Sequence, residues 1–204
     1  MEKSEIIHKI YSTLAAQNSI RVKTFDKGEI ITNFIANRNY CYAILSGACT
    51  LYRYNRNGNM TILQHYMRYD CFGEIFHNVE FNSELSVVAD TKTSVFYFDY
   101  YALFSDEKNK SLTPILGEMI ITQTRQLNDR IEILAKKTIR ERILTYFDII
   151  SKRSLLKEFE LPMSYTAIAS YLGVDRSAMM REIKELENDK ILTRTKHRIK
   201  INKG

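Results

Sequence analysis

Residues 162–201 read PMSYTAIASYLGVDRSAMMREIKELENDKILTRTKHRIKI. Ser164 follows a proline and can cap a helix that runs to Leu172, where Gly173 interrupts it. Asp175 can cap a second helix, which extends to about Asp189. Two helices joined by a short turn that contains glycine predict a helix-turn-helix.

The spacing of apolar residues and the chain that follows support this prediction. Two segments, Ile191–Thr193 and Arg198–Ile201, can form a hairpin with Lys196 and His197 at its tip, which is the wing of a winged helix. The predicted interior positions of the two helices and their turn are Ile168, Ala169, Leu172, Val174, Met179, Ile183 and Leu186.

A winged helix of this kind predicts double-stranded DNA as a partner, because a helix fits the major groove. The first residues of the second helix meet base edges, so we expect base contacts from Arg176, Ser177 and Arg181. Phosphate contacts fix position rather than sequence. We expect them from Ser164, Tyr165, Thr166, Lys184, Lys196, His197 and Arg198.

The charge distribution agrees with a partner made of phosphates. The chain has 204 residues and a formal net charge of +6, and residues 139–204 carry a surplus of five positive charges. After Asp189 there are six basic residues and no acidic ones. A basic segment joined to a nearly neutral one is typical of nucleic-acid binding, although a solvated basic tail has the same composition.

Two more helices are predicted upstream. The shorter one covers Thr138–Ile150 and is followed by a polar joint at Ser151–Ser154. The longer one lies over residues 111–137. Thr113 and Pro114 can begin it, and Gly117 is its one helix breaker. At about 1.5 Å per residue the helix would extend past a small barrel, so we expect it to pair two subunits, with packing on its own domain as the alternative. The predicted dimer stripe is Leu116, Met119, Ile120, Gln123, Leu127, Ile131 and Leu134.

The N-terminal part has a different pattern. Residues 4–16 have helical spacing, and Ser4 could cap this helix. From about Ile20 to Phe98, short runs rich in β-branched and aromatic residues alternate with glycine turns such as Asn55–Asn59. Examples of these predicted strands are Tyr40–Leu45, Cys49–Tyr54, Met60–Tyr66 and Ser94–Phe98. These runs predict an antiparallel sandwich or barrel. The expected class is α+β, with residues 1–110 as a sensor domain, 111–137 as a dimerisation helix and 138–204 as a DNA-binding domain.

Composition excludes several other classes. No run reaches the roughly 18 apolar residues of a membrane span, and the N-terminus lacks a secretory layout, so we expect a cytoplasmic protein. Cys41, Cys49 and Cys71 have neither paired nor clustered spacing, which favours three buried small side chains over a disulfide framework or an iron–sulfur cluster.

The chain resembles the cyclic-AMP receptor protein/fumarate-nitrate regulator (Crp/Fnr) family over nearly its whole length. The resemblance rests on residues 168–187 and on sensor glycines in Lys27-Gly28-Glu29, Ile44–Gly47, Asn57-Gly58 and Cys71–Glu74, with Arg142-Ile143-Leu144 entering the DNA domain. It implies a cyclic-nucleotide-binding-like β-roll (a jelly-roll barrel), a long dimerisation helix and a C-terminal winged helix-turn-helix. It further implies a homodimeric transcription regulator, not an enzyme, that binds an inverted repeat and meets RNA polymerase.

The departures from the family pattern concern the effector. Members that bind cyclic nucleotide have an arginine about ten residues after Gly-Glu, whereas residues 80–86 here hold two acids and no arginine. We therefore expect that the protein does not bind cyclic AMP. Its effector is then either an unidentified molecule or absent. The resemblance places an effector pocket at Gly73, Glu74, Ile75, Phe76, Ser83, Arg125, Leu127 and Asn128.

Other interpretations remain open on sequence grounds. A cupin-type metal enzyme would need His65, Glu74 and His77 as ligands, and their spacing does not match a metal-ligand pair. His77 could serve as a haem ligand in a family that includes haem sensors. A protein-interaction module with a vestigial winged helix is the third alternative. The expectation is therefore that the protein needs no catalytic residue, resident metal or cofactor.

Overall fold

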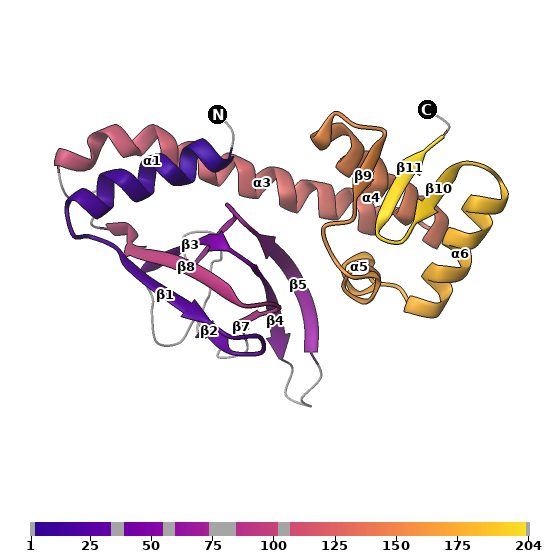
Figure 1. The fold of residues 1–204 in the computed structure, drawn as a ribbon, viewed down its shortest axis with the longest axis horizontal. Coiled ribbons are helices and arrows are strands. Elements are labelled where there is room, and N and C mark those ends of the chain that lie inside the picture. The colour runs from indigo at the N-terminus through magenta and orange to yellow at the C-terminus, as the bar shows by residue number, and fades with distance from the viewer. Residues whose placement is uncertain (1–2, 34–38, 55–59, 74–84, 102–106, 203–204) are drawn as a thin grey trace. The chain divides into compact units, whose positions relative to one another are not determined.

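The computed structural model describes residues 3–33, 39–54, 60–73, 85–101 and 107–202. The chain forms two compact units, an N-terminal unit of residues 1–124 and a C-terminal unit of residues 125–204. Helix α3, Thr113–Ala135, passes from one unit into the other (Figure 1). The segment predicted as a separate dimerisation helix is thus divided between the two units.

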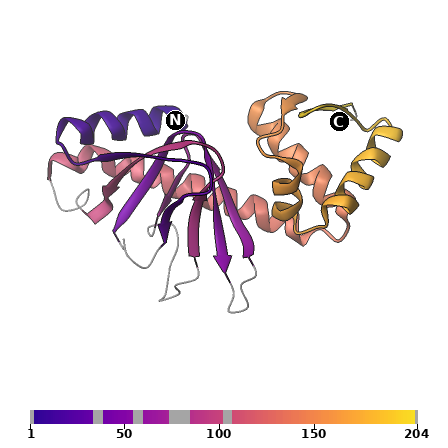
Figure 2. The same cartoon turned by 60° about the horizontal axis from the view of Figure 1, so that its bottom comes forward.

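The described residues of the N-terminal unit form two four-stranded antiparallel sheets (Figures 1 and 2). The strand order is β1-β8-β3-β6 in one sheet and β2-β7-β4-β5 in the other. Both sheets pair strands that are distant in the chain, as in the predicted sandwich or barrel. The strands are β1 Arg21–Phe25, β2 Ile30–Asn33, β3 Tyr40–Ser46, β4 Ala48–Tyr54, β5 Met60–Met67, β6 Cys71–Gly73, β7 Leu85–Ala89 and β8 Thr93–Asp99.

The sheet that contains β3 and β8 is apolar on both faces. Successive side chains of a strand point to opposite faces, so Tyr42 and Ile44 pack in the core shared with the other sheet. Cys41 and Phe96 point the other way and pack against two helices, α1 (Lys3–Ala16) and the start of α3. A 3₁₀ helix, Glu107–Leu112, leads into α3. This packing explains why the strands contain so few polar residues.

The four strands predicted by residue range are confirmed, and one predicted helix start differs. The strands proposed at Tyr40–Leu45, Cys49–Tyr54, Met60–Tyr66 and Ser94–Phe98 are all present. The first helix begins at Lys3, so Ser4 lies inside it and is not its cap. The predicted turn Asn55–Asn59 lies outside the described residues, although β4 and β5 pair with Tyr54 opposite Met60.

As far as residue 202, where its described part ends, the C-terminal unit holds three helices and a three-stranded sheet besides the end of α3. The sheet order is β10-β11-β9, and buried apolar side chains from every one of these elements form one core. The elements are α4 Ile139–Ser154, β9 Glu158–Glu160, α5 Tyr165–Leu172, α6 Arg176–Asn188, β10 Leu192–Thr195 and β11 Arg198–Ile201.

Helix α4 starts where the sequence predicts and ends later. Thr138 and Glu141 form a capping box at its start, in which each side chain bonds the backbone N–H of the other residue. We predicted a polar joint at Ser151–Ser154, and this is wrong, because these residues form the last turn of the helix. Polar residues do not by themselves interrupt a helix, and this one ends at a left-handed residue, Leu155.

Across the described ranges, no helix is long and apolar enough to cross a bilayer.

Candidate nucleic-acid interface

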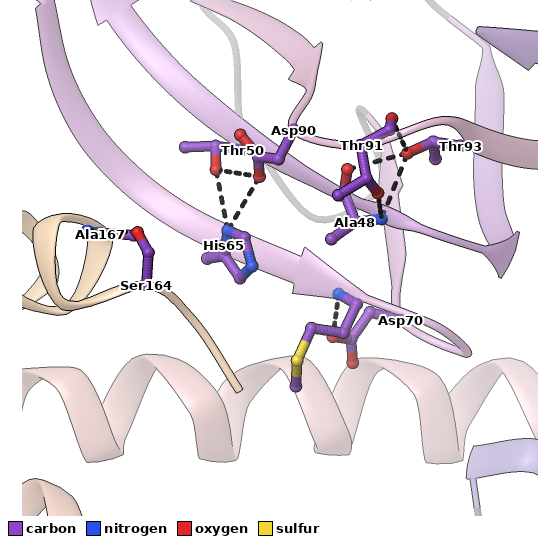
Figure 3. A network of polar contacts seen from close by, with 10 residues as sticks. Ala48, Thr50, His65, Asp70, Asp90, Thr91, Thr93, Ser164 and Ala167 are labelled. Atoms are coloured by element: carbon purple, nitrogen blue, oxygen red, sulfur yellow. Dashed lines mark hydrogen bonds and ion pairs between the residues drawn. The ribbon is translucent and has the colours of Figure 1, made fainter. Parts of the chain in front are cut away.

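Helices α5 and α6 form the predicted helix-turn-helix, and both predicted caps are confirmed. The Ser164 hydroxyl accepts a hydrogen bond from the Ala167 N–H, and the Asp175 carboxylate accepts one from the Ala178 N–H (the Ser164 contact is drawn in Figure 3). Gly173 ends α5 in the left-handed region, at φ 65°. The residues that connect the two helices are therefore fixed by local chemistry.

The recognition helix α6 has one buried and one exposed face. Met179, Ile183 and Leu186 are buried in the core of the C-terminal unit. The predicted base contacts Arg176, Ser177 and Arg181 are all exposed, and so is the predicted phosphate contact Lys184. A helix that is held on one side and carries guanidinium groups on the other can present them to base edges.

The start of α5 is joined to the tip of the wing. The Tyr165 hydroxyl donates to the Lys196 carbonyl at 2.9 Å, and the Tyr165 ring stacks on the His197 ring with centroids 5.4 Å apart. Lys196 adopts a left-handed conformation at the turn between β10 and β11. Tyr165 thus positions the two wing-tip residues that we predicted as phosphate contacts, and Thr166 beside it is exposed.

Two acid–base contacts in this region have no counterpart in the predictions. Arg194, on β10, forms an ion pair with Glu187 of α6 at 3.1 Å and lies 5.9 Å from the centroid of the Tyr165 ring. The Arg198 guanidinium, predicted to contact phosphate, is 65% exposed and 4.0 Å from the Glu158 carboxylate. No sequence signal pairs these residues, because β9 and β11 are joined only by tertiary structure.

Helix α4 holds the recognition helix from behind. Arg140 bonds Glu182 at 3.1 Å and also forms an ion pair with Asp189 at the end of α6. The hydrogen bond that Arg140 donates to the Asp189 carboxylate raises the pKa of Arg140 above its ordinary value, so this side chain stays charged. Arg140 is a residue of the framework rather than of the exposed face, and sequence reasoning gave it no role.

Comparisons with known proteins agree with this geometry. A model described as cyclic nucleotide-binding domain matches residues 22–105, and one described as Crp-like helix-turn-helix domain matches residues 141–203. The two matches together cover most of the chain, with the sensor domain first and the DNA-binding domain second. The chain belongs to the Crp/Fnr family. It is a transcription regulator with a sensor domain and a DNA-binding helix-turn-helix, and not an enzyme.

Solved structures with the same fold are distant in sequence. The structure of FixK2 from Bradyrhizobium japonicum is 23% identical, with a TM-score of 0.70, and the match covers 90% of this chain and 93% of that one. The c-di-GMP responsive global regulator CLP of Xanthomonas campestris is 16% identical, with a TM-score of 0.66 and coverages of 95% and 99%.

A cyclic nucleotide-binding domain containing protein from Listeria monocytogenes EGD-e is 15% identical, with a TM-score of 0.72 and coverages of 96% and 97%. A search of the curated proteins found no match. Identities this low support the fold of this Crp/Fnr regulator, and they do not transfer an effector or an operator to it.

The α3 helix of this Crp/Fnr regulator corrects part of the predicted dimer stripe. Leu116 and Met119 are buried in the core of the N-terminal unit, and the buried Gln123 side chain bonds Gln64 and the Cys71 carbonyl. These three side chains are therefore not available to a second subunit. The other predicted positions, Ile120, Leu127, Ile131 and Leu134, are exposed.

The exposed positions fall into a regular pattern along α3. Ile120, Thr124, Leu127, Ile131 and Leu134 follow one another at alternating intervals of four and three residues. This is the spacing of a coiled-coil seam. Buried and exposed stripes have the same period in one helix, and the sequence pattern therefore could not separate them.

The predicted effector pocket is only partly described. Glu74, Ile75, Phe76 and Ser83 lie outside the described residues, as does His77, while Arg125, Leu127 and Asn128 are exposed on α3. Gly73 is buried at φ 142°, and a Cβ atom there would lie 2.4 Å from the Tyr40 carbonyl oxygen. The fold itself therefore requires glycine at position 73, whatever the pocket binds.

Several polar groups of the N-terminal unit are engaged in the fold. His65, a residue of the cupin alternative, bonds the Thr50 hydroxyl at 2.8 Å and lies 3.1 Å from the Asp90 carboxylate (Figure 3). The described residues hold no group of three or more side chains that could bind a metal ion. All three cysteines are buried and free, as predicted, and burial raises the pKa of the Cys49 thiol well above its ordinary value.

Proposed function

We propose that this Crp/Fnr regulator acts as a homodimer that reads an inverted repeat in double-stranded DNA. The observation that carries the proposal is the exposed face of α6, where Arg176, Ser177 and Arg181 stand clear of a helix buried on its other side. An arginine can donate two hydrogen bonds to guanine, which gives direct readout of a base. Lys184 and the wing-tip residues would then contact phosphates.

The proposed dimer interface is the exposed seam of α3. Ile131 is 66% exposed and Leu127 is 45% exposed, although both are large apolar side chains. Pairing two such seams would remove this surface from water and place two recognition helices on one duplex. Half-sites about one turn of DNA apart follow from two-fold symmetry.

We further propose that the sensor domain does not bind cyclic AMP. The support is the sequence of residues 80–86, which has two acids and no arginine to compensate a buried phosphate. An unidentified small molecule, or another input, would change the population of dimers that fit DNA. If an effector exists, Gly73, Glu74, Ile75, Phe76, Ser83, Arg125, Leu127 and Asn128 are the residues that we expect to surround it. RNA polymerase is the expected protein partner.

Selection from random duplex DNA tests the proposal. Purified protein without added ligand, over a series of salt concentrations, is expected to enrich an inverted repeat. Arg176→Ala and Arg181→Ala are each expected to cost about 1–3 kcal/mol and to relax the preference at one base position. Lys184→Ala should weaken binding to all sequences alike and lower the salt slope by about one.

A charge control comes from Arg21→Ala on strand β1, an exposed arginine of the sensor domain that should leave binding unchanged. If no sequence is enriched, the selection is repeated with small-molecule extract added. A second failure would refute the proposal of sequence-specific DNA binding. Calorimetric titration with cyclic AMP is expected to give no heat of binding, and adding cyclic AMP to the selection should not change the enriched sequence. Saturable binding of cyclic AMP would refute the proposal that the sensor domain does not bind it.

A further inference from the structure

A single arginine side chain, Arg142, forms hydrogen bonds with backbone carbonyls at the ends of two helices in the C-terminal unit. Its Nε donates to the Lys136 carbonyl at 3.0 Å, and its Nη2 donates to the Leu134 carbonyl at 3.3 Å, both at the end of α3. Its Nη1 donates to the carbonyls of Leu172 at 3.0 Å and Gly173 at 3.3 Å, at the end of α5. Arg142 itself lies in the first turn of α4.

These contacts satisfy groups that the helices leave open. The last four carbonyls of a helix have no partner inside the helix, and the partial negative charge of the helix dipole gathers there. A guanidinium group is permanently charged and presents its donors in a rigid planar fork. It can therefore bridge two helix ends in a fixed orientation, whereas the single ammonium of lysine is a point charge on a flexible chain.

Independent packing also places the end of α3 with the DNA-binding helices. Ile133 is 1% exposed and belongs to the core formed by α4, α5 and α6. The Arg130 guanidinium lies 5.0 Å from the centroid of the Tyr171 ring on α5, and desolvation lowers its pKa. The Leu134 side chain is 3.5 Å from the place that a Cβ atom of residue 173 would occupy. The compact C-terminal unit accordingly starts at Arg125, well before α3 ends.

We infer that Arg142 is a positioning residue that makes the end of α3 and the helix-turn-helix one rigid body. The joint between α3 and α4, residues 136–138, then does not act as a free hinge, since one side chain bonds both the joint and the turn after α5. A movement of α3 would be passed to the recognition helix without being absorbed at residues 136–138.

A distance measurement tests the rigid body directly, without relying on the proposed DNA binding. Nitroxide labels are placed at Glu132→Cys on α3 and Glu185→Cys on α6, both exposed sites, in the full chain. The native cysteines are buried, and protein without the added cysteines measures their background labelling. Dilution with unlabelled protein suppresses the signal from pairs of labels that lie in different subunits. The native Arg142 protein is expected to give one narrow distance distribution.

Two substitutions of Arg142 and one matched control decide the outcome. Arg142→Gln removes the charge and the fork, and we expect a broad or split distribution. Arg142→Lys keeps the charge, is the milder change, and should broaden the distribution less. Lys137→Gln removes one positive charge at an exposed side chain of the same joint, and should leave the distribution narrow. A narrow distribution in Arg142→Lys, or equal broadening in Lys137→Gln, would overturn the inference. If Arg142→Gln fails to fold, Arg142→Lys decides alone.

A second readout extends the inference to regulation and rests on the proposed function. Affinity is compared for a duplex with one half-site and for the selected inverted repeat. Arg142→Lys is expected to bind the half-site with the affinity of the native protein. The ratio of its affinity for the repeat to its affinity for the half-site should fall by about tenfold. An unchanged ratio together with a broadened distance distribution would refute a role of Arg142 in placing the two recognition helices on the repeat, and would leave the rigid-body result standing. Failure of the native protein to prefer a repeat would count against the proposed function instead.

Discussion

Gly173 shows how one residue controls the turn of the helix-turn-helix. Its φ of 65° disfavours other residues, while the space around it would admit a Cβ atom at ordinary contact distances of 3.5 and 3.6 Å. We therefore expect Gly173→Ala to lower the free energy of unfolding by about 1–2 kcal/mol through backbone strain alone. Gly173→Asn, which tolerates this conformation better, should cost less. Urea unfolding of both variants measures the difference, and equal costs would point to a steric cause.

Tyr165 makes a testable prediction about the wing. Tyr165→Phe keeps the stacking on His197 and removes the hydrogen bond to the Lys196 carbonyl. We expect a loss of about 1 kcal/mol in stability, as for one hydrogen bond. DNA affinity should fall evenly across sequences, because the wing tip contacts phosphates in our proposal. Binding curves on several duplexes check this, and a loss confined to one base position would show that the wing reads sequence.

At the scale of the element, the start of α4 has a predicted pH dependence. The Thr138 backbone N–H and then its hydroxyl donate to Glu141 and hold the pKa of this exposed carboxylate below its ordinary value. Because the pKa of Glu141 is lower in the folded protein than in the unfolded chain, its ionised form stabilises the fold. This contribution is fully present at pH values above the unfolded-state pKa, and it is lost as the pH falls through the folded-state pKa. Glu141→Gln should remove it.

Chemical unfolding from neutral to acidic pH measures this effect. The native protein should be more stable than Glu141→Gln at neutral pH, and the gap should close toward the acid end. Glu185→Gln, at an exposed acid on α6 with no part in the capping box, is the control. If the difference in free energy of unfolding between the two proteins stays constant with pH, the charge of Glu141 does not contribute to it.

At the scale of the whole molecule, the exposed seam of α3 predicts the oligomeric state. Ile131→Glu places a charge within the proposed interface and should halve the mass measured by light scattering at micromolar concentration. Arg125→Glu, on α3 but outside the seam, changes the charge and should leave the mass as it is. If the native protein is a monomer, or if Ile131→Glu is still a dimer, the exposed seam of α3 is not the dimer interface.

The sequence by itself determined those features that depend on neighbours along the chain. Ser164, Gly173 and Asp175 act on backbone groups within a few residues, and the buried and exposed faces of α6 follow from helical spacing. The strands of the sensor domain were likewise visible in their composition. For the same reason the exposed positions of the predicted base contacts could be expected before the structure was seen.

Only the tertiary structure decided which stripe of α3 is buried and which groups hold the helices in place. Leu116 and Ile120 belong to stripes with the same period, and the difference between them is set by the sheet against which α3 packs. Arg142 bonds carbonyls up to 31 residues away, and Arg140 reaches Asp189 across 49 residues. Backbone carbonyls carry no signature in the sequence, so a side chain that binds them can be recognised only once the chain has folded.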